Sequence, residues 1–322
     1  MNDEKAQSSE DLAADEGKAL INITFDLEMS RHYPERGMTE WDYQKGNLDD
    51  ESKAYTVEAC RQVKAKGGVV HSFVVGQVLE HKSVEWLKGI IDEGHPVGNH
   101  TYDHVRITAT KTEDVQYRFR RSPWLIAGMT PAEAIYENIR LCEIAMQQRL
   151  GIKPAGFGAP YSFSGGIAGR PDVQKMLLSL GYTWVGSKYA GPNVRARDPV
   201  AADYDAFVAV QKDHQPFIYP TGLIEIPCSP PTDVDVFRSH QWKLDEVLRL
   251  VERLIEWTIE NRAMFDLGVH PSIMYVEDPE FKIANLMCDM VNAAGDRAAM
   301  VDLGTFAERA KLQHVGQPAA KH

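Results

Sequence analysis

Short apolar runs alternate with longer amphipathic patterns through most of the chain, and this alternation constrains the fold more than any other feature. Several apolar runs carry β-branched residues at consecutive positions, as strands buried on both faces do. We expect strands at 20–26, 68–75, 95–100, 153–160, 182–187, 223–228, 264–270 and 298–303. Strands that alternate with helices favour a parallel sheet. The sequence therefore predicts an α/β fold, closed or nearly closed into a barrel.

The predicted helices fall between these runs, and several have sequence signals at their ends. Thr130 and Pro131 open the pattern over 131–150, and Gly67-Gly68 end the pattern over 51–66. Ser83 is an N-cap candidate for a helix over 83–93. Further helices are expected at 171–180, 243–262, 278–294 and 304–312. With no internal repeat and no break in composition, we expect one domain over 20–312 and disordered tails at 1–19 and 313–322.

Composition argues against several classes of function. The formal net charge is −11 with no basic run to offset it, which argues against a nucleic acid or an anionic membrane as partner. The four cysteines are scattered and form no CxxC pair, which argues against a zinc knuckle or a disulfide framework. The first nineteen residues lack the basic start and apolar core of a secretory signal. We therefore expect a cytoplasmic protein without a membrane partner.

Titratable residues end several of the predicted strands. Asp26 and Glu28 end the first strand, His100 and His104 follow the third, and His270 ends the seventh. The sites of parallel α/β barrels lie at the carboxyl ends of their strands. If the barrel forms, these acid, base and ligand groups therefore meet at one rim.

His100 and His104 have the spacing of a metal-binding pair. On a helical turn, an i, i+4 spacing puts two side chains on one face, about 5–6 Å apart at Cβ. Two imidazoles and a carboxylate from elsewhere can hold a divalent metal and leave positions open for water and substrate. Two unrelated histidines are the plainer interpretation of this spacing alone. Thr101 stands where a zinc protease of the HExxH type needs glutamate, which excludes that class.

The carboxylates and the last histidine suit proton transfer. Asp26 and Glu28 share one face of an extended strand, so that one can coordinate metal while the other accepts a proton from the attacking water. The spacing leaves open which does which, and a capping or loop role is the alternative. His270 can serve as a general acid because imidazole titrates near neutral pH, although a hydrogen-bonded core histidine would look the same.

The motifs TFDLE, GNHTYDH, GFGAPY and LGVH, in this order, resemble those of polysaccharide deacetylases, which are carbohydrate esterase family four with the nodulation-factor deacetylase homology domain. The resemblance covers roughly residues 20–310. It implies a distorted (β/α)7 barrel in a single domain, and a metal-dependent hydrolase that removes acetyl groups from N- or O-acetylated carbohydrate. It implies Asp26 as the catalytic base, His270 as the general acid, and His100 and His104 as ligands with Glu28 as the inferred third.

The resemblance also implies substrate contacts and a metal. Pro160 and Tyr161 match the motif that forms one side of the substrate groove, in which the N–H of Tyr161 helps to stabilise an oxyanion. Trp184 is the nearest candidate for the family's tryptophan. The implied ion is Zn²⁺, with Co²⁺, Fe²⁺, Mn²⁺ and Ni²⁺ as alternatives.

Two departures from the family pattern bear on the substrate. Leu27 separates Asp26 from Glu28, whereas many members have two adjacent aspartates. Gly158 stands where the family has an arginine that orients the base, and Arg170 is the candidate replacement.

Two alternative functions remain open on these residues. A small-amide hydrolase of the allantoinase type fits the cytoplasmic expectation, and a catalytically inactive carbohydrate-binding barrel fits the missing arginine. The long segments 29–50 and 105–130 are rich in aromatic residues and arginine. They suit stacking on a sugar ring, gripping an anionic group, or a contact between copies in a homo-oligomer.

Overall fold

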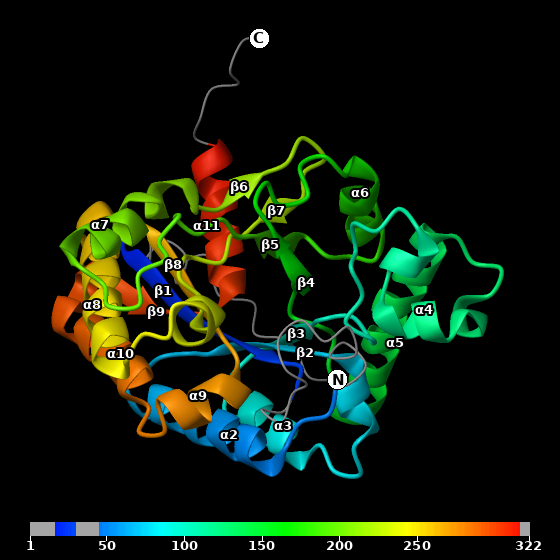
Figure 1. Cartoon of the computed structure of the whole chain (residues 1–322), viewed down its shortest axis with the longest axis horizontal. Coiled ribbons are helices and arrows are strands. Elements are labelled where there is room, and N and C mark those ends of the chain that lie inside the picture. Colours follow the sequence, from blue (N-terminus) through cyan, green and yellow to red (C-terminus); the bar gives the residue numbers. More distant parts are fainter. Residues whose placement is uncertain (1–16, 30–44, 316–322) are drawn as a thin grey trace, which may run out of the picture.

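A single curled sheet organises the fold (Figure 1). The computed structural model describes residues 17–29 and 45–315. The strands are β1 (Ala19–Leu27), β2 (His71–Val74), β3 (Val97–Asn99), β4 (Phe157–Phe163), β5 (Trp184–Lys188), β6 (Phe217–Ile218), β7 (Ile224–Glu225), β8 (Met264–Val269) and β9 (Ala298–Met300). Their order is β6-β7-β5-β4-β3-β2-β1-β8, and β9 pairs with the first residues of β1. Only β6 and β7 run antiparallel among the paired strands described.

This arrangement confirms the predicted fold, a distorted parallel barrel in one domain. Each predicted strand range overlaps a strand of the sheet, although β4 begins and ends later than the predicted range 153–160. The added strand is β6, whose two residues are too short to show a period in the sequence. Among the described residues the edge strands β6 and β8 do not pair, and the sheet is a half-barrel rather than a closed ring.

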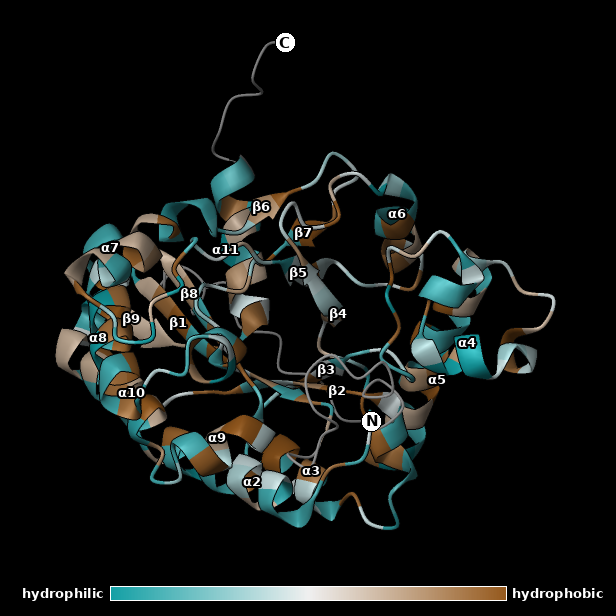
Figure 2. Ribbon diagram, in the orientation of Figure 1, coloured by the Kyte–Doolittle hydropathy of each residue, from teal (hydrophilic) through white to brown (hydrophobic). Residues whose placement is uncertain are grey.

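Helices surround the curled sheet. They are α2 (Asp50–Ala65), α3 (Glu85–Asp92), α4 (Tyr117–Arg121), α5 (Pro131–Leu150), α6 (Pro171–Ser179), α7 (Ala201–Ala209), α8 (Leu244–Asn261), α9 (Pro271–Glu277), α10 (Lys282–Ala294) and α11 (Leu303–Val315). Short 3₁₀ turns occur at Gly76–Glu80, Thr112–Asp114, Pro123–Ile126, Gln211–Asp213 and Gly295–Arg297, and a π-helical turn at Val234–Ser239. Figure 2 shows that outer helices such as α8 and α10 carry both hydrophobic and hydrophilic residues.

Local signals explain the start of α5 and of α10. Thr130 accepts a hydrogen bond from the N–H of Glu133, whose carboxylate accepts one from the N–H of Thr130, so α5 begins with the predicted cap. The predicted helix over 278–294 is wrong at its start. The carboxylate of Asp278 accepts the N–H groups of Lys282 and Ile283, which starts α10 after a break from α9. The helices α4, α7 and α9 were not predicted.

Along β1, apolar side chains that face the outer helices alternate with polar side chains that face the inside of the curled sheet. The residues of β1 that pack against α2, α8, α9 and α10 are apolar and buried: Ile21, Ile23, Phe25 and Leu27. Because successive side chains of a strand point to opposite faces, Asn22, Thr24 and Asp26 face the inside of the curled sheet. β1 therefore supplies polar groups to the interior of the half-barrel.

Helix α11 fills the opening between the two edges of the sheet (Figure 1). Leu303 and Phe306 are each 1% exposed and belong to a core cluster with Met264 of β8, Ile224 of β7 and Trp184 of β5. Helix packing thus replaces the strand pairing that would close a barrel.

Two expectations about the ends of the chain remain. The predicted tails 1–19 and 313–322 lie mostly outside the described residues, although β1 begins at Ala19 and α11 reaches Val315. Within the described ranges, no helix has both the length and the apolar character needed to cross a bilayer.

We predict that Phe306→Ala lowers the free energy of unfolding by about 3–5 kcal/mol, because it leaves a cavity where α11 meets both edges of the sheet. Leu312→Ala is the matched control, since Leu312 lies on the same helix but is 52% exposed, and we expect a change within about 0.5 kcal/mol. Urea unfolding followed by circular dichroism measures both. Equal, small losses would show that α11 does not close the fold.

Candidate active site

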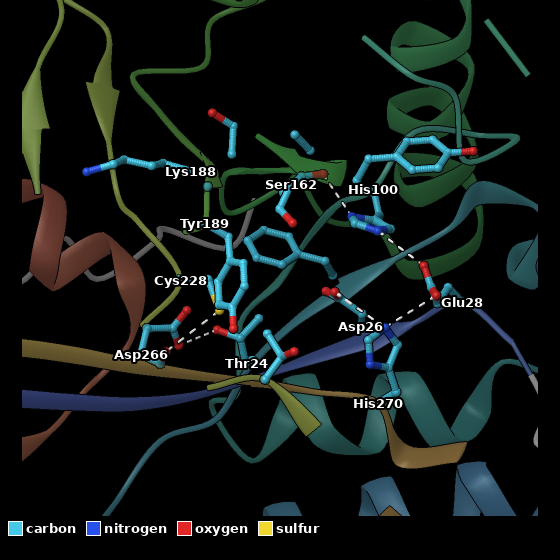
Figure 3. A pocket seen from close by; sticks show the side chains of 18 of the residues that line it. Thr24, Asp26, Glu28, His100, Ser162, Lys188, Tyr189, Cys228, Asp266 and His270 are labelled. Atoms are coloured by element: carbon cyan, nitrogen blue, oxygen red, sulfur yellow. Dashed lines mark hydrogen bonds and ion pairs between the residues drawn. The ribbon is translucent and has the colours of Figure 1, made fainter. Parts of the chain in front are cut away.

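A pocket of about 480 Å³ opens at the carboxyl ends of the strands (Figure 3). Asp26 and Glu28 reach it from the end of β1, His100 and His104 from the segment after β3, and His270 from the end of β8. Its size is typical of small-ligand sites. The structure brings all five of these predicted residues to one place, as expected from the rule that parallel strands present their carboxyl ends at one rim.

Glu28, His100 and His104 form a group that can hold a metal ion. One ligand atom from each residue lies within 4.8 Å of the others. The Nε2 of His104 is 2.7 Å from Oε2 of Glu28, and the Nε2 of His100 is 3.5 Å from the same oxygen. All three residues are buried. Two imidazole nitrogens and a carboxylate oxygen are a common ligand set for Zn²⁺ and related ions, so the donor chemistry fits.

The orientation of His100 supports this geometry. Its Nδ1 lies 2.8 Å from the carbonyl oxygen of Gly158 on β4. A proton on Nδ1 that is donated to this oxygen leaves the lone pair of Nε2 directed at Glu28. Metal-binding histidines are commonly held in this way through their second nitrogen.

The segment that carries the two histidines is a loop and not a helical turn. Thr101 and His104 adopt left-handed backbone conformations, with φ of 59° and 57°. The rings of His100 and His104 nevertheless lie with centroids 5.2 Å apart. Side chains shape the loop instead of helical hydrogen bonds: Asn99 Oδ1 accepts the N–H of Thr101, and Thr101 Oγ1 accepts the N–H of Val105.

His270 lies between the two carboxylates and a third acid. Its Nε2 is 3.4 Å from Oε1 of Glu28 and 3.9 Å from Oδ2 of Asp26. Its Nδ1 is 2.9 Å from Oδ1 of Asp233, and the other carboxylate oxygen, Oδ2, accepts the backbone N–H of His270. Asp233 is 2% exposed. Sequence reasoning missed Asp233, although an acidic residue shortly after the strand predicted at 223–228 was a signal of the same kind as Asp26 and Glu28.

Burial and neighbouring charges separate the pKa values of these groups. Burial alone would lower the pKa of His270, but the charge and hydrogen bond of Asp233, with a contribution from Glu28, raise it well above its usual value. Burial raises the pKa of Asp26, and the positive charges of His100 and His270 offset this only in part. Burial lowers the pKa of His104 to about 3, which favours the neutral imidazole that metal ions require.

Glu28 has the opposite shift to Asp26. Burial alone would raise its pKa, but the charge of Lys45 and the hydrogen bonds of His100 and His104 hold it well below the usual range. The ammonium of Lys45 contacts Oε1 of Glu28, whereas both candidate histidine ligands approach Oε2. Lys45 was not predicted, because it lies in a long segment without a periodic pattern.

Comparison with known proteins finds a polysaccharide deacetylase match within the chain. The sequence profile described as polysaccharide deacetylase matches residues 47–185, which include both histidines of the candidate metal site. This part of the chain is similar to polysaccharide deacetylases. None of the curated proteins compared matches the chain in sequence.

Solved structures share the deacetylase fold. A protein from Mycobacterium smegmatis assigned as a polysaccharide deacetylase has a TM-score of 0.60 at 14% identity, with 95% of each chain covered. A GH57 branching enzyme from Thermococcus kodakaraensis has a TM-score of 0.52 at 10% identity, with 94% of this chain and 72% of that chain covered. At these identities the similarity concerns the fold alone.

Gly158 stands where the deacetylase pattern has an arginine. The ring of Phe73 fills the space that a side chain at this position would need. A Cβ atom on Gly158 would lie 2.6 Å from the ring of Phe73, closer than van der Waals contact allows. That ring is stacked on His100 with centroids 6.2 Å apart. Arg170, the candidate replacement, is wrong: its guanidinium binds Asp172 and the carbonyl oxygen of Thr108, and it does not line the pocket.

Of the three predicted substrate contacts, Tyr161 lines the pocket, Pro160 lies beside residues that line it, and Trp184 does not line it. Tyr161 lines the pocket, and its backbone has a left-handed conformation with φ of 62°. The centroid of its ring lies 5.0 Å from the centroid of the His104 ring. Pro160 is buried within β4, beside the pocket-lining Ala159 and Tyr161. The substrate contact predicted for Trp184 is wrong. Trp184 is 5% exposed, packs against Phe73 in the inner core and does not line the pocket.

The end of the pocket away from Glu28 and His100 carries another acid, Asp266, which was not among the predicted site residues. Figure 3 shows Thr24, Cys228 and Asp266 together at the end away from Glu28 and His100. Oδ1 of Asp266 accepts a hydrogen bond of 2.5 Å from the hydroxyl of Thr24. Burial raises the pKa of Asp266 to about 7, because the hydrogen bond from Thr24 compensates only part of the lost hydration.

We predict that Asp266→Asn stabilises the protein above pH 7 and has little effect near pH 4. The folded-state pKa of Asp266 is raised to about 7 from 3.8, so the wild-type fold loses stability as pH rises between these values. At about 1.4 kcal/mol per pKa unit, the gain at pH 8 is at most roughly 4 kcal/mol. Urea unfolding at pH 4, 6 and 8 measures it. Asp245→Asn, on the exposed side of α8, is the control, and a gain that does not depend on pH would contradict the assignment.

Proposed function

We propose that this chain is a metal-dependent hydrolase that removes acetyl groups from N- or O-acetylated carbohydrate. The buried group of Glu28, His100 and His104 carries this proposal, because it lies beside Asp26 and His270, two residues suited to proton transfer. The match of residues 47–185 to the polysaccharide deacetylase profile supports the reaction class.

Glu28, His100 and His104 would hold the metal, with Zn²⁺ as the first candidate and Co²⁺, Fe²⁺, Mn²⁺ or Ni²⁺ as alternatives. A bound ion of this kind polarises a carbonyl group and lowers the pKa of water, for zinc to about 7. The low pKa of Glu28 and the neutral state of His104 both favour a bound cation.

Asp26 would act as the base that accepts a proton from the attacking water. Its raised pKa brings it nearer to neutral pH, where a carboxylate is a more effective proton acceptor. His270 would donate a proton to the departing amine or alcohol, and Asp233 keeps this imidazole protonated. The N–H of Tyr161 would stabilise the oxyanion, and Pro160 would help to fix that part of the groove. The products are acetate and the free amino or hydroxyl group.

We predict that the wild-type protein binds about one Zn²⁺ per chain and releases acetate from N-acetylglucosamine oligomers, and that a chelator abolishes the release until metal is returned. His104→Ala should lose both metal and activity. His270→Ala should lose activity and retain metal, and His314→Ala, on the exposed side of α11, should retain both. Elemental analysis and an acetate assay measure the two properties.

Other outcomes of the same assay would redirect the proposal. Loss of metal in His270→Ala would contradict the roles assigned here. Hydrolysis of a cyclic ureide without acetate release would indicate an amidase of the allantoinase type. Binding of acetylated sugar without any hydrolysis would indicate an inactive carbohydrate-binding barrel.

We predict that Asp233→Asn shifts the alkaline limb of the kcat/KM profile to lower pH. A general acid must be protonated, and Asp233 raises the pKa of His270, so removing its charge lets His270 lose its proton at lower pH. Asn keeps a side-chain oxygen near Nδ1, which limits the change to charge. Asp235→Asn is a nearby control, since Asp235 bonds Thr232 and Tyr189 instead of His270. An unchanged alkaline limb would exclude the proposed pairing.

A further inference from the structure

Arg106 lies at the border between the active-site pocket and a neighbouring groove. The groove, of about 560 Å³, runs along the segment after the two histidines and includes Tyr117 and Arg120. Arg106 and Tyr161 line both hollows. A substrate held at the candidate metal site can therefore extend past these two side chains into the groove.

The backbone of Arg106 is fixed by its neighbours, and its guanidinium lies over the ring of Tyr161. Val105 and Ile107 on either side are fully buried, and the N–H of Arg106 donates to the carbonyl oxygen of Val115 over 2.8 Å. The guanidinium carbon lies 4.9 Å from the centroid of the Tyr161 ring, which in turn lies 5.0 Å from that of His104. Stacking on an aromatic face fixes the plane of the guanidinium and leaves its N–H groups available at the edge.

Arg106 has no acidic partner among the residues described, in contrast to its neighbours. Arg118 pairs with Asp103 at 2.5 Å, and Arg120 with Asp114 at 3.5 Å. An unpaired guanidinium presents a fork of donors that matches a carboxylate or a phosphate, and such charge-assisted hydrogen bonds are about twice as strong as neutral ones.

The distribution of charge in the pocket also limits where an anion can lie. Asp266 occupies the end away from Glu28 and His100 (Figure 3), and Asp235 lines the pocket as well. An anionic group near these carboxylates would be repelled. Lys45 is taken up by Glu28, and Lys188 donates to the carbonyl oxygen of Asp213. The side of Arg106 is therefore where a negative charge on the substrate is stabilised.

We propose that Arg106 binds an anionic substituent of the substrate, a carboxylate or a phosphate, on the groove side of the acetyl group that is removed. The substrate class is thus an acidic acetylated sugar. This rests on the proposed deacetylase function for the reaction, but the anion site itself does not require turnover.

The test compares the binding of three sugars by isothermal titration: N-acetylglucosamine, its 6-phosphate and the corresponding uronic acid. The zinc-loaded Asp26→Asn variant is used for these measurements, because loss of the proposed base prevents turnover. We expect at least one acidic sugar to bind about tenfold or more tightly than the neutral sugar, as a hydrogen bond between charged groups predicts. The two acidic sugars distinguish carboxylate from phosphate as the preferred group.

Arg106→Gln should reduce the ratio of acidic to neutral affinity toward one, and Arg106→Lys should restore part of it. Arg140→Gln, at an exposed arginine of α5 that pairs with Glu137, should keep the wild-type ratio. Thermal unfolding checks that each variant folds. Equal affinity for all three sugars, or an unchanged ratio in Arg106→Gln, would overturn the proposal. Acidic sugars that bind through Arg106 but release no acetate with Asp26 restored would reject the deacetylase function and leave the anion site standing.

Discussion

The buried carboxylate of Glu28 is the constraint on which the site depends. A carboxylate that is 4% exposed must be compensated by positive charge or hydrogen bonds. His100 and His104 approach one of its oxygens, and Lys45 and His270 approach the other. The curled sheet makes this convergence available, because β1, β3 and β8 end at the same rim while α11 closes the opening that strand pairing leaves.

Two carboxylates that are two residues apart on β1 are given different properties by their surroundings. The pKa of Glu28 is lowered by Lys45 and the histidines, whereas that of Asp26 is raised by burial, which His100 and His270 offset only in part. Environments that separate the pKa values of neighbouring acids commonly separate their chemical roles. The ring of Phe73 fills the space beside Gly158 and stacks on His100.

The sequence predicted the fold and the position of the site because both follow from periodicity. Alternation located the strands, and the rule on strand ends brought Asp26, Glu28 and His270 together. The same reasoning missed Asp233, which follows the strand predicted at 223–228 by five residues and not directly, as Asp26 and Glu28 follow theirs. The prediction did not include the loop from His100 to His104, where side-chain hydrogen bonds of Asn99 and Thr101 decide the backbone. It was also wrong about Trp184, since a motif match does not give the direction of a side chain.

The most direct test of the metal centre is a crystal structure of the zinc-loaded protein with anomalous data collected at the zinc edge. The account predicts one strong anomalous peak bonded to Nε2 of His100, Nε2 of His104 and a carboxylate oxygen of Glu28, with Asp26 and His270 facing the open positions. Zinc–nitrogen distances of about 2.0–2.1 Å are expected for such ligands. A peak that lies elsewhere in the molecule, or the absence of any peak in this pocket at full zinc loading, would contradict the account.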